Sequence, residues 1–314
     1  MRAEWTRRGF LGLCGAASAS AMLTSCSKHP RDDGATGPVT VTHIFGETTI
    51  TQPPTRVVCA GYTGQDEVLA LGVVPIAVTA WLGDQPYGVW PWAQQQLGEA
   101  KPTVLNLDNG IEVKRIAELK PDLIVATNAG VDAETYQQLS AIAPTLPQTG
   151  GDAFFEPWKV QAAAIGTAMH RAQQMQSLVD AVETGFTDVA TANPGFKDKK
   201  VLLLAGRLDE GNVIVTTGWR AAFLTQMGLS VPEVATPVAR DKIRHFLETA
   251  DVMIWATETD DERAALLADT DIAAFAAHSV FTTKDLAAAI AFASPLSYPV
   301  VSAQLPALIA AITG

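Results

Sequence analysis

Apolar side chains recur at steps of three and four residues between Trp158 and Ala190, which is the spacing of one face of an α-helix. The apolar positions are Ile165, Met169, Ala172, Met175, Val179, Val182, Phe186 and Val189. Pro157 suits a first helical turn, and Asn193-Pro194-Gly195 ends the pattern. We therefore predict one helix over 157–192, roughly 50 Å long at 1.5 Å per residue. That length favours a bridge between two bodies, and the alternative is a long helix on the surface of one domain.

Short apolar runs alternate with helical patterns before this helix. Two strand-like runs separated by Gly46 indicate a hairpin over 39–45 and 47–52. Continuous apolar strands then alternate with helices, which is typical of a parallel sheet covered on both faces. The expected strands are 56–60, 75–79 and 123–126, and the expected helices are 65–71, 112–119 and 133–141.

The same alternation resumes after the long helix. We expect strands at 201–205, 213–216 and 252–256, and helices at 221–227 and 299–312. The stretch 119–127 resembles the stretch 248–257, because each joins a helix end, an aspartate and a buried strand. Such a repeat favours two similar α/β lobes, each with a parallel sheet, over the alternative of a single domain. The expected first lobe is 39–156, the joining helix 157–192 and the second lobe 193–314.

Composition is consistent with two hydrophobic cores, and the net charge argues against two classes of binding partner. The 314 residues are 48% hydrophobic, enough to bury one large core or two of ordinary size. The net charge of −11 argues against nucleic acid and against an anionic membrane surface as partners.

The N-terminus has the pattern of an export signal. Arg7 and Arg8 precede a short apolar run that is too rich in Ala, Gly and Ser to span a membrane, which indicates a twin-arginine signal over 1–26. Leu23-Thr24-Ser25-Cys26 resembles a bacterial lipobox, in which Cys26 is acylated and becomes the new N-terminus; the alternative is a plain signal peptide. The polar stretch 27–38 is expected to be a flexible tether.

The chain has three cysteines and no visible catalytic motif. Cys14 leaves with the signal and Cys26 would carry lipid, so Cys59 remains alone, and we interpret it as a buried strand residue. Phosphate-binding loops, nucleophile elbows and zinc-protease motifs are missing from the sequence. The histidines show no ligand spacing, so we predict no enzyme, no built-in cofactor and no metal held directly by the protein. They are His29, His43, His170, His245 and His278.

Aromatic residues form the most distinctive cluster. They follow the strand 75–79 in an irregular segment broken by Gly and Pro, where ligands of open α/β sheets bind. We predict that Trp81, Tyr87, Trp90 and Trp92 stack on a flat organic ligand. The alternative for each is a place in the core of its own lobe.

The ends of the other strands add further candidates. Tyr62 and Asn128 follow the strands 56–60 and 123–126, and Arg207 and Glu258 follow strands of the second lobe. A guanidinium at a cleft mouth can hold a carboxylate, hydroxamate or catecholate bidentately, although Arg207 could equally form a surface salt bridge with Asp209 or Glu210. Trp219 and Arg220 add a stacking surface and a second charge.

These elements together carry a family resemblance over the chain from Thr55 onward. The motifs are Arg56-Val57-Val58, Asp66 to Val73 with its A-L-G-V, Ile116 to Ile124 with L-K-P-D-L-I, Ala143-Pro144, and Ser294-Pro295-Leu296-Ser297. They resemble the iron-siderophore, haem and cobalamin class of ABC-transporter solute-binding proteins, also known as class III. The resemblance implies an α/β fold of two Rossmann-like lobes joined by one rigid helix. It also implies that a ferric siderophore or haem binds between the lobes with little hinge closure.

The resemblance also implies partners. Members of this class dock on an ABC permease through an acidic residue on each lobe, and the first position falls on Asp66, with Glu67 beside it. The second lobe has no acid near Trp219 and Arg220, so either Asp209 or Glu210 substitutes or this second contact is missing. We expect a monomer, anchored outside the cell membrane through Cys26. The alternative is a lipoprotein scaffold or sensor that kept the fold without transport.

One expectation concerns motion. A continuous helix between the lobes would resist bending, because its interior hydrogen bonds would have to break. We therefore expect little closure on ligand binding. A kink, if present, is expected near Gly166 or Gly185, where helix propensity is weakest.

Overall fold

The computed structural model of the chain describes residues 37–313. Arg7, Arg8, Cys26 and most of the tether 27–38 lie outside the described residues. Within 37–313, no helix is both long and apolar enough to cross a membrane.

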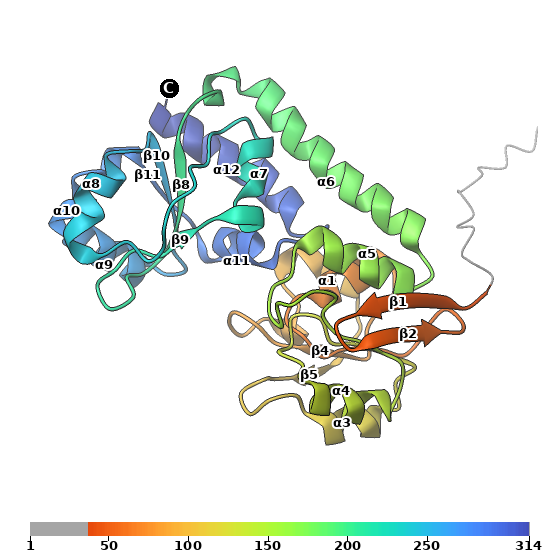
Figure 1. The fold of residues 1–314 in the computed structure, drawn as a ribbon. Helices are drawn as coiled ribbons and strands as arrows, with labels where there is room; N and C mark the ends of the chain where they lie inside the picture. The colour runs from red at the N-terminus through yellow and green to blue at the C-terminus, as the bar shows by residue number, and fades with distance from the viewer. Residues whose placement is uncertain (1–36, 314) are drawn as a thin grey trace, which may run out of the picture. The chain divides into compact units, whose positions relative to one another are not determined.

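The first lobe is built on a five-stranded parallel sheet. Its order is β5-β4-β3-β6-β7, and the strands are β3 (Val57–Cys59), β4 (Ala77–Thr79), β5 (Thr103–Leu105), β6 (Leu123–Val125) and β7 (Thr145–Leu146). The labels β4 and β5 mark the place of this sheet in Figure 1. The hairpin is confirmed: β1 (Val39–His43) pairs antiparallel with β2 (Gly46–Ile50). The parallel arrangement is confirmed for this sheet, with β3 between β4 and β6.

The second lobe is built on a four-stranded sheet in the order β11-β10-β8-β9. The strands are β8 (Val201–Ala205), β9 (Val215–Thr216), β10 (Val252–Ala256) and β11 (Ser279–Phe281). β10 runs parallel to β8 and to β11. β9 pairs antiparallel with β8, so the prediction of a parallel sheet is wrong at this edge. A short connection from β8 to β9 permits only an antiparallel return.

Helices cover both sheets. In the first lobe they are α1 (Gly64–Ala70), α2 (Gln94–Leu97), α3 (Val113–Leu119), α4 (Ala133–Ser140) and α5 (Trp158–Ala168). α6 (Ala172–Ala192) follows, and then α7 (Ala222–Gln226), α8 (Ile243–Leu247), α9 (Asp260–Ala268), α10 (Thr270–Ala273), α11 (Lys284–Phe292) and α12 (Tyr298–Thr313).

One apolar core runs through both lobes. It contains Val57 and Leu123 of the first sheet, Ile165 of α5, Phe186 of α6 and Val201 of the second sheet. Alternate strand residues point to the opposite faces, as the two-residue period requires. The apolar residues on the opposite face of each sheet form a separate cluster. In the first lobe it lies beneath α3 and α4, and in the second lobe beneath α8, α9 and α10.

The prediction of one continuous helix over 157–192 is wrong. α5 ends at Ala168 and α6 begins at Ala172, with His170 in the left-handed region at φ 57°. The His170 amide donates to the Thr167 carbonyl and the Arg171 amide to the Gly166 carbonyl, which is a Schellman ending. The break lies three residues or more beyond Gly166, and α6 packs so tightly there that a Cβ on Gly166 would meet the Met175 Cβ at 2.6 Å.

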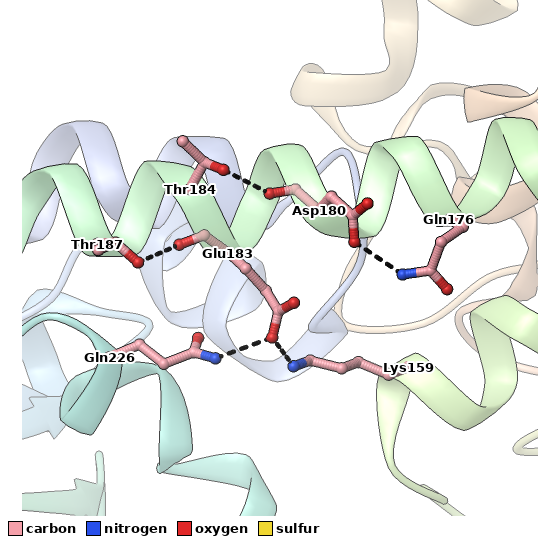
Figure 2. A network of polar contacts seen from close by, with 7 residues as sticks. All are labelled: Lys159, Gln176, Asp180, Glu183, Thr184, Thr187 and Gln226. Carbon is pink, nitrogen blue, oxygen red and sulfur yellow. Dashed lines mark hydrogen bonds and ion pairs between the residues drawn. The ribbon is translucent and has the colours of Figure 1, made fainter.

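The two helices pack antiparallel, and a polar network fixes them (Figure 2). Lys159 in the first turn of α5 forms an ion pair with Glu183 in the middle of α6. The same Glu183 carboxylate accepts a hydrogen bond of 3.2 Å from Gln226 of α7. α5 also contacts β1, α1 and β7, so it belongs with the first lobe, and α6 is the helix that leads to the second. The exact domain boundaries stay predictions.

Candidate functional site

The first lobe brings two loops into close contact at the carboxyl ends of β3 and β6. Gly61 follows β3, and a Cβ there would lie 1.7 Å from the Thr127 carbonyl oxygen. Only glycine allows this approach. The approach places Tyr62, which follows Gly61, beside the loop that follows β6.

Aromatic rings from the loops after β3, β4 and β7 form a wall next to this contact. Tyr62 stacks on Trp81 with 5.4 Å between ring centroids, and Trp81 lies 5.2 Å from Phe155. Phe154 lies 6.2 Å from Tyr62 and is 46% exposed. We call Tyr62, Trp81, Phe154 and Phe155 the ring wall. Two of its members, Tyr62 and Trp81, are residues that the sequence predicts as ligand contacts.

The second lobe contributes a cation to the ring wall. The Arg220 guanidinium lies 4.4 Å from the centroid of Phe155 and 5.2 Å from that of Trp219. Burial lowers the pKa of Arg220, while Tyr298 and Asp152 act in the opposite direction. That Trp219 and Arg220 supply a stacking surface and a charge to a ligand stays a prediction.

Trp90 and Trp92 lie in the packing behind the ring wall. Trp90 is 1% exposed, stacks on Trp92 at 5.0 Å, and donates its indole N–H to the Trp81 carbonyl. The prediction that Trp90 stacks on a ligand is therefore wrong for this conformation, because its faces are covered by protein. Trp92 is partly buried and donates to the Asp66 carboxylate at 2.8 Å.

Asn128 is also no ligand contact. It is 4% exposed, and its amide is fully used within the protein. The side-chain N–H groups donate to Thr63 and to Gln161, both at 2.7 Å, and the side-chain oxygen accepts the Phe155 amide at 2.7 Å. The strand-end rule places Asn128 correctly but does not show that the lobe covers it.

The predicted docking acids of the first lobe are buried. Asp66 and Glu67 are 1% and 0% exposed, so neither can contact a permease in this conformation. Asp66 accepts hydrogen bonds from Ser294 at 2.5 Å and from Trp92, and Glu67 accepts one from Gln161 at 2.9 Å. Burial raises the pKa of Asp66 to about 6, and burial together with the neighbouring Asp66 charge raises the pKa of Glu67 to about 8.

The remaining candidates lie on the surface. Tyr87 is 38% exposed, and Arg207, Asp209, Glu210 and Glu258 are exposed as well. Among the ring contacts of the described chain, none joins Tyr87 to the ring wall, and no described ion pair joins Arg207 to Asp209 or Glu210.

The ring wall and Arg220 offer surfaces suited to binding an organic molecule. Four rings offer flat faces, and one partly desolvated guanidinium offers paired N–H donors. Within residues 37–313, no group of three or more His, Cys, Asp or Glu side chains is arranged to hold a metal ion. The arrangement suits an organic ligand with a flat or apolar part and an anionic part.

Sequence reasoning missed Phe154, Phe155 and Phe292. The two phenylalanines lie in the loop after β7, a two-residue strand that was not predicted, and Phe292 of α11 lies 5.1 Å from Trp81. A signal for the pair existed: Thr145 is β-branched and Leu146 is apolar, which suits a short strand beside β6, and Gly150-Gly151 indicates a loop after it. Phe292 is brought near only by the packing of α11.

A family model and two curated proteins match this chain. The model of the periplasmic binding protein family matches residues 57–285. Among curated proteins, the chain is 26% identical over 215 residues to YfiY of Bacillus subtilis, named a probable siderophore-binding lipoprotein, covering 68% of this chain and 63% of YfiY. It is 26% identical over 200 residues to FecB of Escherichia coli, the Fe(3+) dicitrate-binding periplasmic protein, covering 62% of each. The chain thus spans less than two thirds of the length of either relative.

Solved structures share the fold. A periplasmic solute-binding protein of Mycobacterium smegmatis is 59% identical, with a TM-score of 0.87 over 88% of this chain and 99% of that one. PiaA of Streptococcus pneumoniae, solved with ferrichrome, is 23% identical, with a TM-score of 0.71 over 88% of this chain and 98% of that one. At this identity the likeness to PiaA shows the fold alone.

Proposed function

The chain belongs to the periplasmic binding protein family, and from this we infer that it is an extracytoplasmic receptor for an iron chelate, a ferric siderophore or haem, which it delivers to an ABC permease. The fold is of class III, and the protein is a binding protein, not an enzyme. The names of YfiY and FecB, each the name of another protein, support an iron chelate as the ligand.

The observation that carries this proposal is the ring wall with Arg220 against it. An iron chelate presents flat or apolar ligand arms and negatively charged oxygens in one compact body. Tyr62, Trp81 and Phe154 offer faces for the arms, and Arg220 offers a charge for the oxygens. Binding in this place would use contacts from both lobes.

Titration of tryptophan emission tests the proposal. Ferric hydroxamate, ferric catecholate, ferric citrate and haem are each added to the purified protein, and quenching gives the affinity. Trp81→Ala is expected to weaken binding of the preferred chelate by roughly 1 to 3 kcal/mol, since it removes a central ring. Tyr87→Ala is the matched control, an exposed aromatic of the same segment outside the ring wall, and should leave affinity unchanged.

Charge is tested in the same assay. Arg220→Ala should weaken an anionic chelate more than a neutral one, whereas Arg207→Ala, at an exposed side chain, should have the smaller effect. Equal losses for both kinds of chelate would assign Arg220 to packing. If no member of the panel quenches the wild-type protein, the proposed ligand class is wrong.

We further propose that Cys26 is acylated and holds a monomeric receptor at the outer face of the cell membrane. The motif Leu23 to Cys26 and the lipoprotein name of YfiY support this. Mass spectrometry of the native N-terminus tests it, and a free Cys26 would contradict it. For the permease, the exposed Asp209 and Glu210 are the remaining candidate contacts, and their joint replacement by Asn and Gln should reduce uptake without affecting chelate affinity.

A further inference from the structure

The ring wall rests on a loop with an unfavourable backbone. Phe155 has φ 63°, in the left-handed region that bulky residues rarely adopt. Its ring nevertheless completes the wall, because it contacts Trp81 and lies beneath Arg220. Something must hold this backbone in place.

The loop after β6 fixes this backbone with two hydrogen bonds. The Asn128 side-chain oxygen accepts the Phe155 amide at 2.7 Å, and the Gly130 amide donates to the Ala153 carbonyl at 3.0 Å. The Phe154 ring also lies directly on Gly130, where a Cβ would come within 2.3 Å of it. Residues 153–155 are therefore shaped by residues 128–130.

Asn128 is itself fixed from the other side. Both of its N–H groups are used, one toward Thr63 at the start of α1 and one toward Gln161 of α5. Gln161 in turn donates to Thr63 at 3.0 Å and to Glu67 at 2.9 Å. With its oxygen and both hydrogens committed, the Asn128 amide has one orientation, and that orientation presents the oxygen to Phe155.

We propose that Asn128 is a positioning residue: it fixes Phe155, and with it the ring wall, without touching the ligand. The ligand-binding part of this inference rests on the proposed function. Affinity would then depend on a buried amide one layer beneath the site, and the wall would be rigid before the ligand arrives, which lowers the entropic cost of binding.

The test uses two substitutions that differ in one hydrogen bond. Asn128→Gly accepts the left-handed backbone, φ 54° at this position, but removes the amide. Asn128→Asp keeps an oxygen for the Phe155 amide and loses the two donated bonds. Asn212→Asp is the matched control. The Asn212 side-chain oxygen also accepts a backbone amide, that of Arg240, but this hydrogen bond lies in the second lobe, away from the Phe155 loop.

Two measurements are made on each variant. Hydrogen exchange of the peptide containing Phe155, without ligand, reports the hold on the loop, and fluorescence titration reports affinity for the chelate that the wild type prefers. Asn128→Gly should speed exchange at Phe155 and weaken binding about tenfold, because the buried hydrogen bond that fixes the Phe155 amide is among the three that this variant loses. Asn128→Asp should lie between Asn128→Gly and the wild type in both measurements, and Asn212→Asp should match the wild type.

The outcomes separate the two proposals. Unchanged exchange at Phe155 in Asn128→Gly would overturn the positioning role, as would weaker binding without faster exchange, which would indicate direct contact. If the wild type binds none of the chelates, the proposed function fails, while the exchange measurement still decides whether Asn128 fixes the loop. Circular dichroism of each variant confirms that it folds.

Discussion

The two lobes use one framework and differ in what stands on it. In the first lobe, Asp122 before β6 accepts the Thr55 and Arg56 amides that lead into β3; in the second, Asp251 before β10 accepts the Lys200 amide that leads into β8. Gly61 follows β3 against the Thr127 carbonyl, as Gly206 follows β8 against the Ala256 carbonyl. The sequence echo between 119–127 and 248–257 thus encodes the joining of neighbouring strands.

The two lobes differ in the polarity of the side chains that are buried near the ends of their strands. In the described chain all three buried carboxyl side chains, Asp66, Glu67 and Glu156, lie in the first lobe. In the second lobe, Thr257 after β10 and Thr282 after β11 are buried, and the hydroxyl of each donates to the carbonyl of the other. The first lobe therefore fixes its rings with a buried polar network, whereas the second lobe contributes one cation, Arg220.

The shared glycines give the largest expected effect. Gly61→Ala would place a Cβ 1.7 Å from a backbone oxygen, and Gly206→Ala would place one 2.3 Å away. We expect each to lower the free energy of unfolding by about 3 kcal/mol or more, Gly61→Ala by the larger amount, because backbone cannot move aside cheaply. Urea unfolding followed by tryptophan emission measures both.

Gly195→Ala is the control for that pair, since nothing lies within 4 Å of the added Cβ. It should change the free energy of unfolding by less than about 0.5 kcal/mol. If Gly61→Ala behaved like this control, the close approach of the two loops would be wrong.

The buried acids give the second effect, and it is specific to the first lobe. Because the folded-state pKa values of Asp66 and Glu67 are raised to about 6 and about 8, the folded state binds more protons than the unfolded state, and stability is lost as pH rises from about 4 to 8. Glu67→Gln keeps an acceptor for Gln161 and cannot ionise. It should therefore be more stable than the wild type at pH 8 and similar to it at pH 4.

Each pKa unit corresponds to about 1.4 kcal/mol, so the gain at pH 8 should be clear in urea midpoints. Glu118→Gln, at an exposed acid of α3, is the control and should leave the pH dependence unchanged. A Glu67→Gln protein that loses stability with rising pH as steeply as the wild type would show that Glu67 is not a source of that loss.

The framework aspartates give the smallest effect and test how alike the lobes are. Asp122 accepts three hydrogen bonds, from the Thr55 amide and hydroxyl and from the Arg56 amide, whereas Asp251 accepts the Lys200 amide. Asp122→Ala should cost about 2 kcal/mol of unfolding free energy and Asp251→Ala about 1 kcal/mol or less. Equal costs would mean that the number of bonds does not decide the contribution.

The central strands of both lobes could be predicted from the sequence, because each is marked by a local run of apolar residues. Continuous apolar runs place β3, β6, β8 and β10 correctly, and β8 and β10 match their predicted bounds. The break between α5 and α6 could not be seen, because Met169-His170-Arg171 contains neither Gly nor Asn to mark a helix end. It depends on tertiary contacts, including a hydrogen bond from Arg171 to the Leu71 carbonyl.

The sequence predicts where the candidate site residues lie in the fold, but not how deeply each side chain is buried. The strand-end rule finds Tyr62 and Asn128, but only the fold shows that Tyr62 is partly exposed and Asn128 covered. Asp66 and Glu67 read as ordinary carboxylates of a first helical turn. They are buried by partners distant in sequence, Ser294 for Asp66 and Gln161 for Glu67.

The single thiol of the described chain has a practical consequence. Cys59 lies in β3 with no exposed surface, and burial raises its pKa well above the usual range, so it stays protonated and out of reach of alkylating reagents. A protein begun at residue 37 therefore needs no cysteine removed before labelling. Phe154→Cys would accept one environment-sensitive dye at the edge of the ring wall, where its emission would report binding of the proposed chelate.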